Sequence, residues 1–90
     1  MNKNELIEAI AEKSELSRVA AGRALSATIE AITQALGKGD SVTLVGFGSF
    51  LISQRKARDG HNPQTGEVMK IPAMRVPRFR PGKLLKDAVK

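Results

Sequence analysis

The feature that most constrains the fold is a turn motif, residues 60–66 (GHNPQTG), placed between two segments rich in lysine and arginine. Asn62 favours a turn through its side chain, Pro63 fixes φ near about −65°, and Gly66 adopts positive φ at little cost. Residues 50–58 and 68–76 have the pattern of extended chain. We therefore predict a long two-stranded ribbon with a proline near its tip. Such a ribbon has no core of its own and is marginal alone in water.

Charge is unevenly distributed along the chain, whose net charge is +6. Residues 1–40 carry five basic and six acidic side chains, a balance of −1, whereas residues 41–90 carry ten basic and three acidic ones, a balance of +7. Uniform solubilising charge would not segregate in this way, so the asymmetry favours a polyanion-binding half. The alternative is a solvated basic face. The basic side chains flanking the turn motif are Arg55, Lys56, Arg58, Lys70, Arg75, Arg78 and Arg80.

The N-terminal half, residues 1–40, has the pattern of a helical hairpin. Asn2 followed by Glu5 resembles a capping box, and Ser17 is a good N-cap for a second, longer helix. Small residues crowd that second helix, and close packing is a plausible reason for Gly22 in its interior. The glycines of Gly37-Lys38-Gly39 predict its end.

From Asp40 the apolar period changes to two. We predict a short strand over 41–45, a reversal at 46–48, a second strand from 49 into the basic arm, and a return strand over 68–80. Pro72 and Pro77 belong at edge positions or bulges, because proline cannot donate to a ladder. A last short helix follows Gly82. The expected fold is α+β, with a three-stranded antiparallel sheet and a protruding arm. The single domain, 1–90, comprises a helical base (1–40), a β saddle and arm (41–82, tip about 59–67) and a C-terminal helix (83–90).

The chain is short of large core residues, since it has no Trp, no Tyr and only three Phe. A projecting ribbon leaves too little for a comfortable monomer, and without cysteine no disulfide compensates. We therefore expect an intertwined dimer. The absence of cysteine fits a reducing cytoplasm. We expect neither a signal peptide nor a membrane-spanning segment.

Catalysis has little support in the sequence. The one histidine, His61, lies in the turn motif without cysteine or a convergent carboxylate pair. Gly46-Phe47-Gly48 lacks the third glycine of a dinucleotide-binding loop and lies between two strands. We expect no catalytic residues, no metal site and no cofactor.

Nucleic-acid binding has a clear physical basis. Basic side chains along a ribbon neutralise phosphates and release counterions. No aromatic residue lies between Phe50 and Phe79, so base-stacking platforms for single strands are missing. This pattern indicates a duplex, held either from outside or through its minor groove, and an apolar Pro63 at the apex could insert between base steps.

Three motifs resemble the bacterial histone-like HU proteins: residues 46–50 (GFGSF), 58–66 (RDGHNPQTG) and 76–83 (VPRFRPGK). The resemblance extends over essentially the whole chain. It implies a dimer that binds and bends duplex DNA with little sequence preference, prefers bent, nicked or kinked duplex, and compacts the nucleoid in the cytoplasm. The resemblance implies Pro63 as the intercalating wedge and, as phosphate contacts, Arg55, Arg58, Arg75, Arg78, Arg80, Lys83 and Lys86. The further residues that we expect to bind DNA are Lys56, His61, Asn62, Gln64 and Lys70. The expected dimer core contains Leu36, Leu44, Phe47, Phe50 and Phe79.

The arm departs from the usual family pattern at three positions. His61 stands where many members have a basic residue, and Asp59 and Glu67 add negative charge close to the tip. We expect weaker contacts at the tip, and binding that strengthens as His61 gains a proton. Two other functions stay open: sequence-specific bending, as in integration host factor, and an interaction module that holds an acidic protein or RNA. Pairing with a paralogue also stays open.

Overall fold

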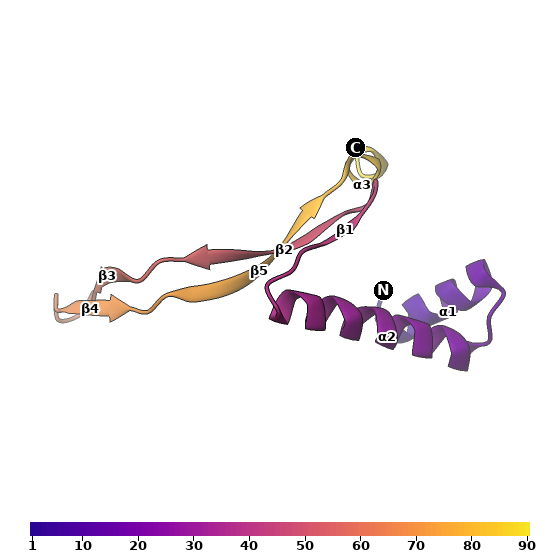
Figure 1. The fold of residues 1–90 in the computed structure, drawn as a ribbon, viewed down its shortest axis with the longest axis horizontal. Helices are drawn as coiled ribbons and strands as arrows, with labels where there is room; N and C mark the ends of the chain where they lie inside the picture. The colour runs from indigo at the N-terminus through magenta and orange to yellow at the C-terminus, as the bar shows by residue number, and fades with distance from the viewer. The chain divides into compact units, whose positions relative to one another are not determined.

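The computed structural model describes residues 1–90 and divides them into two compact units, Met1–Gln34 and Ala35–Lys90. Two helices come first, five strands follow, and a short helix closes the chain (Figure 1). All paired strands are antiparallel. The predicted α+β class is confirmed, with its helical N-terminal part, antiparallel sheet and C-terminal helix.

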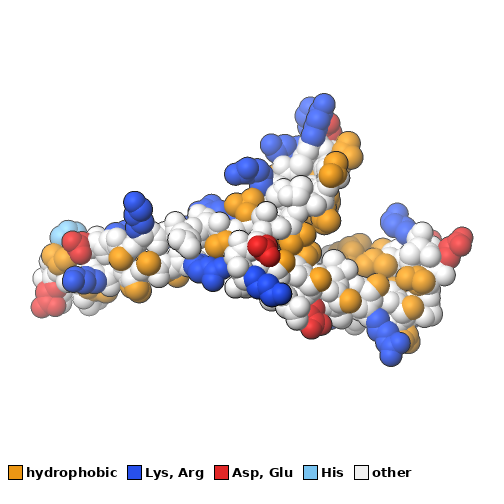
Figure 2. Space-filling view, viewed as in Figure 1, with side chains coloured by type: hydrophobic (Ala, Val, Ile, Leu, Met, Phe, Trp, Pro, Cys, Tyr) orange, Lys and Arg blue, Asp and Glu red, His pale blue; other side chains and the backbone are white.

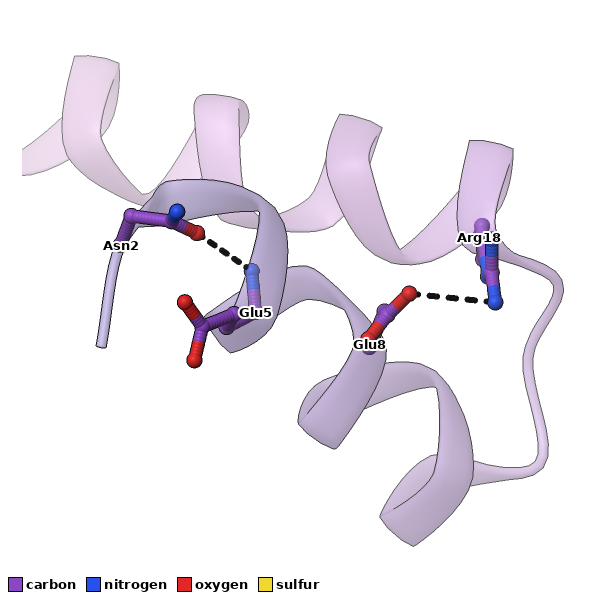
Figure 3. Close-up of polar contacts among 4 residues, drawn as sticks. All are labelled: Asn2, Glu5, Glu8 and Arg18. Atoms are coloured by element: carbon purple, nitrogen blue, oxygen red, sulfur yellow. Dashed lines mark hydrogen bonds and ion pairs between the residues drawn. The ribbon is translucent and has the colours of Figure 1, made fainter.

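The first unit holds α1 (Lys3–Ser14) and most of α2 (Arg18–Gly37). Both predicted N-caps are confirmed. The Asn2 side-chain oxygen accepts from the Glu5 amide at 2.9 Å (Figure 3), and the Ser17 hydroxyl accepts from the Ala20 amide at 3.1 Å. Figure 3 also shows the ion pair between Glu8 and Arg18, 3.1 Å long. Both of its side chains are exposed, so it contributes little to stability.

The interior glycine of α2 has more room than its sequence context indicated. A Cβ built on Gly22 would lie 3.6 Å from Cδ1 of Ile7, which is ordinary van der Waals contact. Within one chain, close packing therefore does not explain this glycine, contrary to the expectation from its small neighbours. The end of α2 agrees with the prediction, since Gly39 follows the helix with φ of 89°.

The second unit contains a three-stranded sheet, in the order β1 (Val42–Leu44), β2 (Gly48–Arg55) and β5 (Met74–Pro81). The predicted reversal is present but lies at residues 45–47 instead of 46–48, and in it the Phe47 amide donates to the Leu44 carbonyl at 3.0 Å. Gly46 has φ of 85°, and a Cβ there would lie only 2.7 Å from Cδ1 of Leu84. The positive φ favours glycine at this position, whereas the exposed and flexible Leu84 side chain could shift to make room for a Cβ.

The arm is less regular than the sequence predicted. Its outer part is a separate two-stranded sheet of β3 (Arg58–His61) and β4 (Val68–Ile71). The continuous ribbon that we expected is interrupted at residues 56–57 and 72–73. Pro72 lies in this interruption, and because proline has no backbone N–H it cannot donate a ladder hydrogen bond there. Pro77 lies in β5, which is an edge strand, as predicted.

The closing helix, α3, covers Lys83–Ala88 and so ends before the predicted Lys90. Within the second unit, β3 and β4 form one end and α3 lies at the other, with the β2–β5 ladder between them (Figure 1). Leu84, near the start of this helix, is 69% exposed.

A single chain has almost no core. Ala21 is the one fully buried hydrophobic residue. The aromatic side chains form a small cluster, in which the Phe79 ring centroid lies 5.6 Å from that of Phe47 and 4.8 Å from that of Phe50. Phe47 nevertheless stays 47% exposed. This much uncovered apolar surface is what a chain needs in order to complete its core with a second chain.

Candidate nucleic-acid interface

The tip of the arm is a hydrogen-bonded turn around Pro63. The Asn62 side-chain oxygen accepts from the Gln64 amide at 2.9 Å, and the Asn62 amide donates to the Glu67 carbonyl at 2.8 Å. Gly66 has the expected positive φ, 72°, and its amide donates to the Asn62 carbonyl at 2.7 Å. These bonds confirm the predicted turn. They place Pro63 at an exposed apex, held by a backbone that is internally satisfied.

Along the β2–β5 ladder, the register sorts the basic side chains by face. Successive side chains of a strand point to opposite faces, and directly paired residues share one. Arg78 pairs with Leu51, Arg80 with Ser49 and Met74 with Arg55. Arg55, Arg78 and Arg80 therefore share one face of the ladder. Sequence reasoning named these three residues, and the register brings them together.

The opposite face of the same ladder is apolar at the end that pairs Phe50 with Phe79. It contains the pair of Phe50 with Phe79 and the pair of Ile52 with Pro77. Arg75, opposite Gln54, belongs to this face and not to the arginine face. Its Nη2 donates to the Leu36 carbonyl at 3.3 Å. Sequence reasoning grouped Arg75 with the other arm cations, although its even spacing from Phe79 would have placed it on the aromatic face.

The outer arm carries mixed charge. Asp59 lies directly opposite Lys70 in the β3–β4 register, and His61 lies opposite Val68 on the same face. Opposite charges at paired positions attract, so Asp59 offsets part of the positive field of Lys70. Figure 2 shows lysine and arginine along the arm and acidic side chains near its free end. The weaker DNA contact that we expect at the tip is therefore explained in part by Asp59 acting on Lys70.

A shallow hollow lies beside the ladder interruption, with a volume of about 460 Å³. Arg58 and Lys70 contribute cations to its wall, and Asp59 contributes one carboxylate. Lys56 lies in the interruption itself. The remaining predicted cations, Lys83 and Lys86, are three residues apart on α3 and so lie on neighbouring positions of one helix surface.

Two kinds of site are absent from the structure. No group of three or more His, Cys, Asp and Glu side chains is arranged to hold a metal ion. No helix has both the length and the apolar character needed to cross a bilayer.

These features describe a basic two-stranded arm on a small α+β chain, and the family comparison agrees. The family described as bacterial DNA-binding protein matches residues 1–90. The chain belongs to this family.

Its relatives within the family are HU proteins, so the resemblance seen in the sequence is confirmed. DNA-binding protein HU of Geobacillus stearothermophilus is 60% identical over 90 residues, which cover 100% of both chains. HU-beta of Pseudomonas aeruginosa is 57% identical over 89 residues, 99% of each chain.

Solved HU structures share the fold. A chain of the Anabaena HU–DNA cocrystal structure superposes with a TM-score of 0.89 at 53% identity, covering 99% of this chain and 97% of that one. HU from Thermotoga maritima gives a TM-score of 0.72 at 37% identity, with 100% of both chains covered.

Proposed function

We propose that this protein binds double-stranded DNA with little sequence preference and bends it, as an architectural component of the bacterial nucleoid in the cytoplasm. The observation that carries the proposal is the arginine face of the β2–β5 ladder, which leads into an arm with an exposed proline at its apex. The strong likeness to a chain from an HU–DNA cocrystal supports it. The proposal assigns the protein no reaction and no cofactor.

The arginine face supplies the affinity. Arg55, Arg78 and Arg80 neutralise phosphates along one side of the ladder, and the counterions that they release make binding salt-dependent. Guanidinium groups suit this role because their planar fork matches phosphate oxygens. The same role extends along the arm and onto α3 through Lys56, Arg58, Lys70, Lys83 and Lys86, and through His61 when it is protonated. Gln64 carries no charge and would only donate a hydrogen bond to a phosphate.

The proline apex supplies the bend. Pro63 is apolar, exposed and held in a rigid turn, so that it presents a wedge whose ordering cost is already met in the free protein. Unstacking one base step costs on the order of a few kcal/mol, and a bent duplex offsets this cost by wrapping more protein surface. Nicked or pre-kinked duplex should bind more tightly, because part of that cost has already been removed.

The structure favours sequence tolerance over sequence reading. Base recognition needs free donors and acceptors that reach base edges. At the tip, the Asn62 side-chain oxygen is already bonded to the Gln64 amide. On the ladder, the side chains placed for contact are arginines suited to phosphates. Sequence-specific bending, the alternative drawn from integration host factor, has no such observation in its favour.

Two copies of the chain are needed for this function. We propose a homodimer that completes its core with Leu36, Leu44, Phe47, Phe50 and Phe79. In one chain Leu44, Phe47 and Phe79 are 42%, 47% and 40% exposed, which is far more than core residues allow. The dimer would also present two arms to one duplex. A heterodimer with a paralogue would use the same surface.

A competition titration tests the proposed function. Duplexes of several unrelated sequences, the same duplexes with a nick, single-stranded DNA, RNA and an acidic protein are compared at several salt concentrations. We expect nicked duplex to bind most tightly and intact duplex next. The logarithm of affinity should fall linearly with the logarithm of salt concentration. Preference for one duplex sequence would favour the integration-host-factor alternative. Preference for RNA or an acidic protein would overturn the proposal.

A further inference from the structure

Arg75 makes a contact unlike that of any other cation in the arm. Its guanidinium Nη2 donates to the carbonyl of Leu36, a residue 39 positions away in the sequence. The other side-chain hydrogen bonds of the structure join residues at most six positions apart. This bond is therefore the one side-chain hydrogen bond that connects the start of β5, which we call the base of the arm, to a distant part of the chain.

The end of α2 provides a favourable partner for this cation. The last turn of the helix contains no basic residue of its own. Its terminal carbonyls carry the partial negative charge of the helix dipole, which a nearby cation stabilises. The Leu36 carbonyl also accepts from the Gly39 amide at 2.9 Å, and a Cβ on Gly39 would lie 3.7 Å from Nη2 of Arg75. The guanidinium of the exposed Arg75 therefore lies against one side of the turn after α2.

The strand register separates Arg75 from the other arginines of the ladder. Arg75 belongs to the face of Phe50 and Phe79, whereas Arg78 and Arg80 belong to the opposite face. A side chain on the aromatic face that already donates to a helix carbonyl is poorly placed to follow the same phosphate backbone.

We propose that Arg75 is a positioning residue, which holds the base of the arm against the α2–β1 junction, residues 35–40, instead of binding a phosphate. The inference rests on the proposed bending of DNA and adds how the arm keeps its direction. Without Arg75, β2 and β5 remain paired, but their junction with the turn after α2 loses its side-chain bond. The arm then samples more directions, so phosphate contacts persist while bending becomes less uniform.

The free protein gives a first test that does not depend on DNA. Backbone amide order parameters are measured by NMR for the parent, Arg75→Ala and the matched control Arg78→Ala, which removes an arginine from the other face of the same strand. We expect Arg75→Ala to lower the order parameters of residues 54–58 and 70–76, and Arg78→Ala to leave them at the parent values. Equal profiles for the two variants would overturn the positioning role.

A conservative variant guards against simple destabilisation. Arg75→Lys keeps a cation near the helix end but loses the planar fork. Its arm order parameters should fall between those of the parent and Arg75→Ala while its circular dichroism matches the parent. A lysine variant as mobile as the alanine variant would count against the charge-assisted bond.

Salt dependence on DNA then distinguishes a positioning role from a phosphate contact. The logarithm of affinity falls as the logarithm of salt concentration rises, and each lost phosphate contact makes this negative slope shallower by about one. We expect Arg78→Ala to make the slope shallower, and Arg75→Ala to keep the parent slope while the energy transfer between duplex ends becomes weaker and broader. A slope made equally shallow by both variants would overturn the inference. If the parent itself fails to bend duplex, the proposed function fails, whereas the order parameters still decide the role of Arg75.

Discussion

Glu15 follows α1 in the left-handed conformation, with φ of 58°, and it is the one residue other than glycine with positive φ. This conformation costs a side-chain-bearing residue about 1 kcal/mol or slightly more, and glycine avoids the cost. We expect Glu15→Gly to raise the free energy of unfolding by about 1 kcal/mol. Urea denaturation at one fixed protein concentration measures the change. Glu15→Ala is the control, and an equal gain from it would show that charge, and not φ, is responsible.

His61 is the one histidine of the chain and lies at the arm tip. Its side chain is exposed and belongs to the face of Asp59 and Lys70 on the outer arm. Glu67, across the turn, is the other acidic group near it. Histidine is the side chain whose charge changes near neutral pH, and its positive form attracts DNA phosphates. We therefore expect DNA binding to strengthen modestly as the pH falls from about 8 to about 6, by less than about 1 kcal/mol per arm because the tip is solvated.

His61→Gln is the matched variant for the pH experiment. It should bind duplex like the parent at about pH 8 and fail to improve at about pH 6. His61→Arg should bind more tightly at the higher pH and lose most of the pH dependence. The same pH dependence in the parent and in His61→Gln would show that the histidine takes no part.

At the scale of single residues, local chemistry was readable from the sequence. The caps at Asn2 and Ser17 and the turn at Asn62 and Gly66 depend on side chains within a few positions, and the structure confirms them. The role of Arg75 depends on a carbonyl 39 positions away, and no local pattern indicates it.

The arm is the element whose geometry departs most from the sequence prediction. Period-two alternation located β2 and β5, which contribute Phe50 and Phe79 to one face of their ladder. The same alternation continues through residues 56–57, where the structure loses its ladder. Pro72, which we expected at an edge position or a bulge, lies on one side of this interruption. The residues that lie opposite one another at this interruption are set by the register between strands distant in the sequence. No local sequence pattern predicts that register.

Pro63 tests the arm as a bending element. We expect Pro63→Ala to reduce bending more than affinity, because the phosphate contacts of the arginine face remain while the wedge between base steps is lost. Energy transfer between dyes at the duplex ends measures bending, and anisotropy measures affinity on the same samples. Gln64→Ala, one position along the same turn, is the control and should bend DNA like the parent. Equal bending by Pro63→Ala and the parent would reduce Pro63 to a turn-former.

For the whole molecule, the shortage of core predicts that folding and association are one event. Ala21 alone is fully buried among the hydrophobic residues, and Phe47 is 47% exposed in one chain. We expect sedimentation at micromolar concentration to give about twice the chain mass, and stability to rise with protein concentration. Phe47→Asp should unfold the protein as well as separate it. A folded monomer, in the parent or in this variant, would contradict the dimer.

The central claim, bending of duplex DNA without sequence reading, is tested most directly by energy transfer between the ends of short duplexes titrated with the parent protein. Several duplexes of unrelated sequence and equal length are compared at one salt concentration. The account predicts that transfer rises on all of them to a similar plateau, and that added salt reverses the rise. Binding without any gain in transfer, or a gain confined to one sequence, would contradict it.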